Sequence, residues 1–278
     1  ASLPTAADAA AAGETPLAAL HRFMGWRGAE AEAAWEAETG WNLLTLAVAM
    51  DNEPAVAELL AGDAEAVKAL LHAKGGKMFV PGMKGSKTPG SKKEAPPHRR
   101  EPLGQKLSQY AEGMSPLMAA LTFASVSIVT TLLDAGAPVE RDGMTLLGER
   151  PCTFRGAVIA GKHENVALFL SRYPQYTNMI TATTNYCPLH FVAFSGLGQV
   201  ETMRALLEAG AKPTVTHESS FTGSVLSAAC ATYDQDPAFI KMLLEAGADA
   251  TKPETLPGIV KVMRPLSLVF RALGNVQM

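Results

Sequence analysis

One segment of the sequence has the residue types of a phosphate-binding loop. Residues 156–163 read GAVIAGKH, which matches the glycine-rich pattern ending in Gly-Lys, except that His163 replaces the serine or threonine that binds magnesium. Such a loop needs a strand before it and free backbone amides within it. No strand signal precedes the segment, and we expect residues 157–160 to be helical. The pattern therefore does not predict a nucleotide site, and the sequence indicates no cofactor.

Cysteine and histidine, the other residues with catalytic potential, form no recognisable motif. Cys152, Cys187 and Cys230 are separated by 35 and 43 residues and include no CxxC pair. Neither a zinc site nor a disulfide framework is therefore indicated, and a reducing compartment is expected. No spacing joins a cysteine, a histidine and a carboxylate into a triad, although catalytic groups can converge from distant positions. We predict that the protein is not an enzyme and has no metal site.

The elements that must carry any site recur along the chain. An apolar pair occurs at Leu132-Leu133, Phe169-Leu170, Leu206-Leu207 and Leu243-Leu244, always 37 residues apart. After three of these pairs comes an acidic residue followed by Ala-Gly-Ala, where a left-handed glycine is expected to close a helix. After the Phe169 pair, Pro174 provides the stop. Upstream, Ser115 and Pro116 have the residue types of a helix cap and a first helical position. The pattern therefore predicts that each repeat consists of a helix, a turn, a second helix and an extended connection.

This pattern resembles the ankyrin repeat. The family's Thr-Pro-Leu-His phrase is approached by Ser-Pro-Leu at 115–117 and by Pro-Leu-His at 188–190, and residues 161–166 resemble its inter-helix turn. The resemblance covers most of the chain from about Thr15 onward. It implies that His190 hydrogen-bonds the backbone between repeats. Because the family unit has 33 residues and this one has 37, we expect enlarged turns and hairpin loops, around residues 196–199 and 233–237 among others.

The ends of the pattern are less regular. Residues 1–14 are expected to form a tail, 15–74 degenerate N-terminal repeats, 75–110 a basic insertion, 111–254 four repeats and 255–278 a partial repeat. In the first repeat, residues 29–38 are the expected second helix. In the second repeat, residues 55–60 and 64–71 both fit as the second helix, and the turn-like sequence at 62–67 favours the later segment. The predicted fold class is an all-α helix-turn-helix solenoid with long hairpin loops and one insertion of disordered-looking composition.

Composition agrees with a helical fold. Of the 278 residues, 47% are hydrophobic, 18% charged and only 6% aromatic, which suits close-packed helices better than a β-sandwich. No apolar run is long enough to cross a bilayer, and no secretory signal is seen. The sequence starts at Ala1 without methionine, so a removed presequence or trimming is expected. We predict a cytoplasmic protein, or one in the reducing interior of an organelle, and not a secreted one.

A basic segment interrupts the repeats between Lys74 and Lys106. It carries nine basic and two acidic residues, a net charge of +7, while the rest of the chain carries −10. One interpretation is a solvated loop, or one lying on the acidic remainder of the chain. The other is an anchor for an acidic partner surface, through Lys84, Lys87, Lys92, Lys93, Arg99 and Arg100. Phe79 is the segment's only aromatic residue, so nucleic acid is a poor candidate.

The ankyrin resemblance implies a protein partner, docked on hairpin tips and the exposed side of the first helices. The matching positions, besides Thr122, are Phe123, Arg141, Met144, Ile159, Tyr186, Phe194, Ser195, Phe221 and Thr232. The four aromatic residues among them are the preferred anchors, because buried aromatics dominate interface energy, although each could instead pack against a neighbouring hairpin. We expect an interaction scaffold or a subunit of a larger complex. The alternative is a regulatory ankyrin segment of a larger enzyme or channel.

The C-terminal residues carry an apolar stripe. Residues 265–273 can form a helix with Leu266, Val269, Phe270 and Leu273 at helical spacing. Part of this stripe should pack on the preceding unit near Met242. Solenoid ends normally carry a polar cap, and this end has an apolar stripe instead. We therefore expect Val269, Phe270 and Leu273 to form an interface with another chain or with further residues.

Overall fold

The computed structural model describes residues 12–73, 115–139, 155–180, 186–195, 200–215, 223–231 and 237–251, together with residues 254–255 and 262–263. These residues contain thirteen α-helices, a short 3-10 helix and one pair of short strands. The chain divides into two compact units, Ala1–Glu140 and Arg141–Met278. Within the described ranges, every helix is too short or too polar to span a bilayer. Because helices make up nearly all of the regular structure in the described ranges, the predicted helical class is confirmed.

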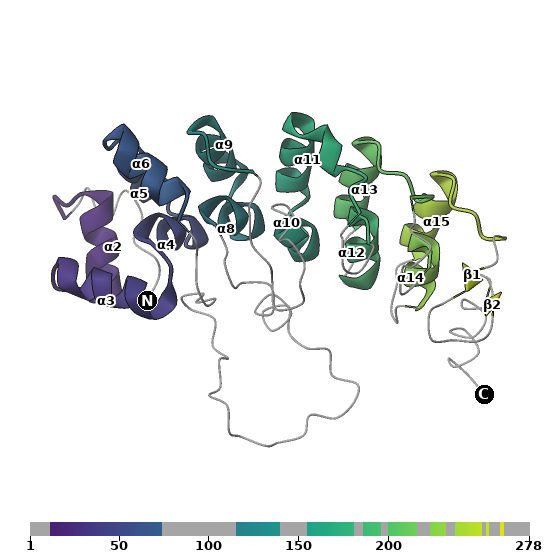
Figure 1. Cartoon of the computed structure of the whole chain (residues 1–278), viewed down its shortest axis with the longest axis horizontal. Helices are drawn as coiled ribbons and strands as arrows, with labels where there is room; N and C mark the ends of the chain where they lie inside the picture. The colour runs from purple at the N-terminus through teal and green to yellow at the C-terminus, as the bar shows by residue number, and fades with distance from the viewer. Residues whose placement is uncertain are drawn as a thin grey trace, which may run out of the picture. The chain divides into compact units, whose positions relative to one another are not determined.

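The first unit contains two helical hairpins that pack on each other. Its helices are α2 (Pro16–Met24), α3 (Ala29–Thr39), α4 (Leu43–Ala49), α5 (Glu53–Leu60), α6 (Ala64–Leu71), α8 (Pro116–Phe123) and α9 (Val126–Asp134). The α4–α5 hairpin packs on the α8–α9 hairpin, with α4 against α8 and α5 against α9 (Figure 1). α2 packs against α5, and α6 contacts both α4 and α8.

The second unit stacks three hairpins in the same manner. Its helices are α10 (Arg155–Ala160), α11 (His163–Arg172), α12 (Pro188–Ser195), α13 (Val200–Glu208), α14 (Val225–Ala231) and α15 (Pro237–Glu245). The first helices α10, α12 and α14 pack in succession, and so do the second helices α11, α13 and α15 (Figure 1). A 3-10 turn (Pro174–Tyr176) follows α11. β1 (Glu254–Thr255) and β2 (Val262–Met263) form an antiparallel pair.

The second helices keep the 37-residue period of the sequence. α9, α11, α13 and α15 begin at Val126, His163, Val200 and Pro237, each 37 residues after the last. The connections 196–199 and 232–236 are longer than the two-residue turns before α9 and α11, as expected. Among the described residues between 115 and 247, none belongs to a strand. The predicted helical hairpins and their spacing are therefore confirmed.

Glycine closes the second helices as predicted. Gly136, Gly210 and Gly247 have φ angles of 82°, 88° and 92°. In each case the glycine N–H and the next N–H donate back to carbonyls of the apolar pair, for example Ala137 N to Leu132 O at 2.9 Å. This arrangement satisfies carbonyls that the helix end would otherwise leave without partners. An L-residue with a Cβ is strained at such a φ, so the recurring glycine has a conformational cause.

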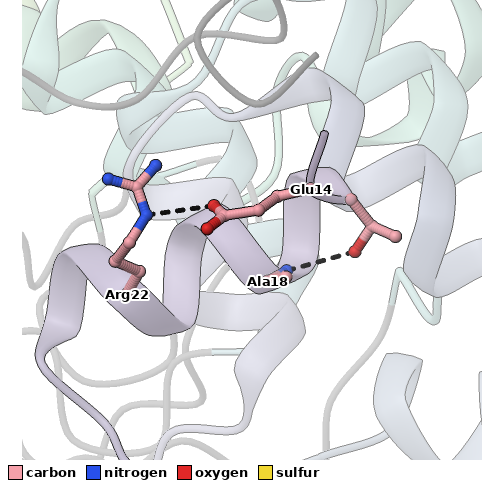
Figure 2. Close-up of polar contacts among 4 residues, drawn as sticks. Glu14, Ala18 and Arg22 are labelled. Atoms are coloured by element: carbon pink, nitrogen blue, oxygen red, sulfur yellow. Dashed lines mark hydrogen bonds and ion pairs between the residues drawn. The ribbon is translucent and has the colours of Figure 1, made fainter. Parts of the chain in front are cut away.

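Several helix starts are capped by side-chain oxygens. Ser115 Oγ accepts from Met118 N at 3.3 Å at the start of α8, as predicted. Thr15 Oγ1 accepts from Ala18 N at 3.2 Å in the same way, and Glu14 pairs with Arg22 at 3.0 Å across the first two turns of α2 (Figure 2). Each cap satisfies an N–H that has no partner within the helix.

The N-terminal helices correct two expectations. α5, which begins directly after α4, is the helix that packs along it, so the preferred assignment of residues 64–71 as its partner is wrong. The segment 64–71 is helical, but it is a further helix, α6. Residues 29–39 are helical as expected, yet α2 packs mainly on α5 instead of pairing with α3. Glu58 of α5 fixes this docking by accepting from Leu17 N at 2.9 Å.

Asp51 explains why the α4–α5 turn was not recognised. It has a φ of 52°, and Asp51 N and Asn52 N donate to Val48 O and Ala47 O at 3.0 and 2.9 Å. This is the cap that glycine makes elsewhere in the chain. Its Oδ1 also accepts from Ser125 N at 2.8 Å, at the start of α9. An aspartate therefore takes the position that glycine occupies in the other caps, and its bond to the neighbouring hairpin compensates for the strained conformation.

Candidate functional site

His190 lies at the centre of the best-defined polar cluster in the second unit. It is fully buried in the first turn of α12. Its Nδ1 accepts from Cys187 N at 3.2 Å, and its Nε2 lies 3.1 Å from Gly223 O, just before α14. Because Nδ1 accepts, the proton is on Nε2, which donates to the Gly223 carbonyl. The predicted role of His190, a bond to the backbone of the neighbouring hairpin, is confirmed.

Cys187 completes the cluster but is not set up as a nucleophile. Its Sγ lies 3.1 Å from His190 Nδ1, and the residue is buried. Burial raises the pKa of the Cys187 thiol above its usual range, because desolvation disfavours the thiolate, and backbone hydrogen bonds lower it by less. A thiol held protonated is a poor nucleophile, since the thiolate is the reactive form.

An aromatic group covers this cluster. The Tyr186 ring stacks on His190, with centroids 5.2 Å apart and planes at 18°. Its edge also meets Phe191 at 6.0 Å and 81°. The Arg155 guanidinium, at the start of α10, lies over the Phe191 ring with its carbon 4.4 Å from the centroid. Tyr186 keeps partly exposed surface, whereas Phe191 and Arg155 are buried. The starts of α10 and α12 therefore present one rigid aromatic side chain to the surface.

The predicted partner-contacting residues have different environments. Phe123, at the end of α8, is half-buried, like Tyr186, and both retain surface that a partner could touch. Ile159 is only 8% exposed, and Thr122 is buried and donates to Met118 O at 2.8 Å. Ile159 and Thr122 therefore belong to the interior of their units. Phe194 and Ser195 are in α12, but their side chains lie outside the described part of the structure.

The other predicted site residues lie outside the described ranges. For partner binding these are Arg141, Met144, Phe221 and Thr232. All six residues of the proposed basic anchor, Lys84, Lys87, Lys92, Lys93, Arg99 and Arg100, do so as well, and so do Val269, Phe270 and Leu273. Their assignments remain predictions.

The glycine-rich segment 156–163 is helical where a phosphate loop would need open backbone. α10 spans Arg155–Ala160, as predicted, and Gly161 N and Lys162 N donate to Val158 O and Ala157 O. His163 begins α11. In the described ranges, no group of three His, Cys, Asp or Glu side chains is arranged to hold a metal ion.

Turn-to-turn hydrogen bonds hold the hairpins in register. In the first unit, Asp51 accepts from Ser125 N, and Ser127 Oγ donates to Glu53. In the second unit, Asn178 Nδ2 donates to Gly210 O at 3.1 Å, and its Oδ1 accepts from Lys212 N at 2.9 Å. Each pair satisfies polar groups at helix ends through a neighbouring hairpin, so the stacking is directional as well as hydrophobic.

The last described hairpin exposes an apolar position that α9 and α11 bury. Leu244 of α15 is 44% exposed, whereas Leu170, at the same position in α11, is 2% exposed. α11 has α13 packed on it, whereas the principal helix contacts of α15 among the described residues are with α13 and α14, which precede it. The expectation that this end of the chain is an interface concerned residues further along, and Leu244 was not named.

Two features were missed in the sequence. Arg155 and Phe191 meet only because α10 packs on α12, and no motif joins residues 36 positions apart. The sequence also did not predict the pair formed by Trp26, just before α3, and Trp35 within it, whose ring centroids are 5.3 Å apart. A signal was available for this pair, since the chain has only three tryptophans and two fall within ten residues of each other.

Comparison of the sequence with protein-family models gives no match, and comparison with curated proteins gives none either.

Proposed function

We propose that the chain is an ankyrin-type repeat protein whose hairpins form a solenoid. Three observations support this proposal: the 37-residue spacing of the second helices, their shared glycine caps and the bond from His190 to Gly223. In a repeat protein each unit contacts only its neighbours, and the stack offers an extended surface. The proposed assignment extends to the ranges that the structure does not describe, including the basic insertion and the partial C-terminal repeat.

The proposed function is to bind a partner protein, as a scaffold or as a subunit of a complex. The observation that carries it is Tyr186, a partly exposed ring held by stacking on His190 and by its edge contact with Phe191. A rigid aromatic side chain loses little conformational entropy on binding and offers a large contact area. No cofactor or catalytic step is part of this proposal. A reducing compartment is also proposed, because the spacing of the three cysteines in the sequence indicates no disulfide framework.

Co-purification with charge-introducing variants tests this function. The tagged full chain is isolated from its native source, and the proteins that remain bound are identified and quantified. Tyr186→Arg should reduce a specific partner about tenfold or more, because loss of an aromatic hot spot costs about 2 kcal/mol. Glu164→Arg, at an exposed position on α11, is the matched control and should retain the partner.

Both variants should first be compared with the wild type by circular dichroism and thermal unfolding, so that a folding defect is not mistaken for lost binding. Equal retention of the same partner by both folded variants would contradict the proposed role of the Tyr186 surface.

A further inference from the structure

α3 in the first unit is a helix without a place in the helical core. None of the principal helix contacts among the described residues involves it. Its sequence, AEAEAAWEAET, has no apolar stripe, and Glu30, Glu36 and four alanines are exposed. Gly28 precedes it without a side-chain cap. An isolated helix of 11 residues is marginal in water, so α3 depends on the few contacts that hold it.

Those contacts form a small aromatic cluster on the surface. Trp35 of α3 lies against Trp26, with centroids 5.3 Å apart and planes at 51°. Trp26 in turn meets the His21 ring edge-on at 5.5 Å, and His21 Nε2 lies 3.2 Å from Glu32 Oε2. Both indoles are only half-buried. Trp41, the third tryptophan, is fully buried, so surface exposure is particular to this pair.

The charges around the indoles favour a cationic partner. Glu32 and Glu36 flank Trp35 and are four residues apart, so two like charges share one helix face, which is unfavourable. On α2, His21 already lies 3.2 Å from Glu32, and Arg22 pairs with Glu14 (Figure 2). Arg27 is exposed beside Trp26, yet residues 12–73 and 115–139 together carry eleven acidic and three basic residues, a net charge of −8. Indole faces also attract cations directly.

We propose that the face of α3 formed by Glu32, Trp35 and Glu36, with Trp26 beside it, docks a lysine- and arginine-rich segment of a partner protein. The partner's cations lie between the two carboxylates and over the indole rings, which relieves the repulsion and stabilises α3. The inference that this basic segment belongs to a separate protein rests on the proposed partner-binding function. The surface itself is independent of the Tyr186 surface, so the two can fail separately.

The test titrates the full chain with a synthetic 12-residue peptide of alternating glycine and lysine or arginine, and follows tryptophan fluorescence at low salt. The peptide should change the emission of the half-buried indoles Trp26 and Trp35, and the affinity should fall as salt is added. Glu36→Gln should weaken binding about threefold to fivefold, the range of one exposed charge interaction. Because this variant removes a like-charge pair, it should not unfold α3, which circular dichroism checks.

Glu65→Gln on α6 is the matched control, since it removes the same charge from another exposed helix position. Its affinity for the peptide should stay within about twofold of the wild type. Equal weakening by Glu36→Gln and Glu65→Gln would overturn the proposal, because binding would then follow net charge alone. Absence of any binding at low salt would overturn it too.

A third arm identifies the source of the cations. The six basic residues Lys84, Lys87, Lys92, Lys93, Arg99 and Arg100 are replaced together by glutamine, and the titration is repeated. If the peptide binds this variant but not the wild type, the chain's own basic residues are the occupant, and the proposed separate partner is wrong. Equal binding to both supports a separate partner. Loss of peptide binding in Tyr186→Arg is not expected in either case.

Discussion

Replacing His190 by phenylalanine removes two hydrogen bonds while keeping an aromatic ring in the same buried space. The change leaves Cys187 N–H unpaired in the interior and Gly223 C=O unpaired in a half-buried position. An unsatisfied buried polar group costs about 1–3 kcal/mol, so we assign about 2 to the first and about 1 to the second. The more apolar ring regains about 1 kcal/mol through burial. We therefore expect His190→Phe to lower the free energy of unfolding by about 2 kcal/mol.

Urea denaturation followed by circular dichroism measures this loss. With an m-value of about 2 kcal/mol per molar urea, the midpoint should fall by about 1 M without a change in slope. His163→Phe, at an exposed position on α11, is the matched control and should change stability by less than about 0.5 kcal/mol. If both variants unfold at the wild-type midpoint, His190 does not link the α12 and α14 hairpins in the way described.

Four further expectations follow from the same geometry. Asp51→Ala should lower stability by about 1 kcal/mol in urea denaturation, because it loses the bond to Ser125 N and keeps the strained φ, whereas Asp51→Gly should cost less. Leu170→Ala should cost about 2–5 kcal/mol and Leu244→Ala less than about 1, and equal losses would show that Leu244 is covered. Burial raises the pKa of the Cys187 thiol, so the folded state keeps a proton that the unfolded thiol loses above about pH 8.5. The stability that this thiol contributes is therefore present below that pH and is lost as the pH rises. Cys187→Ala should make the loss of folding stability between about pH 8 and 10 smaller. Deleting residues 76–103 should leave thermal stability nearly unchanged, since loop length enters logarithmically, while a basic anchor in this segment would show as weaker, less salt-dependent partner binding.

The sequence predicted the second helices well because their signals are local. An apolar pair followed by glycine defines both the buried face and the end of a helix, and Gly136, Gly210 and Gly247 adopt the predicted conformation. The same is true of the Ser115 cap. These features depend on residues within one or two turns, so tertiary context did not alter them.

The α4–α5 hairpin was misassigned because a residue other than glycine closes α4. Asp51 takes the left-handed conformation there, and its carboxylate is paired with a backbone N–H from the next hairpin. Residues 62–67 carry the glycine and resemble the family's turn more closely. The bond that makes Asp51 suitable joins residues 74 positions apart, so it cannot be read from the local sequence.

The packing of α2 and α3 was not predictable for another reason. α3 is rich in alanine and has no apolar stripe that would indicate a core-facing surface. The contact of α2 with α5, fixed by Glu58 and Leu17, arises between segments 41 residues apart. Of the candidate site, His190 was found through its motif, whereas Arg155 and Phe191 come together only through helix packing.

The central proposal is that this protein binds a partner protein through the surface at the start of α12. A photoreactive amino acid placed at position 186 tests it most directly, with the same group at position 164 on α11 as the control. After irradiation of the native assembly, the proposal predicts a specific protein cross-link from position 186 and little or none from position 164. Cross-linking from position 164 to a specific partner, with none from position 186, would contradict the account.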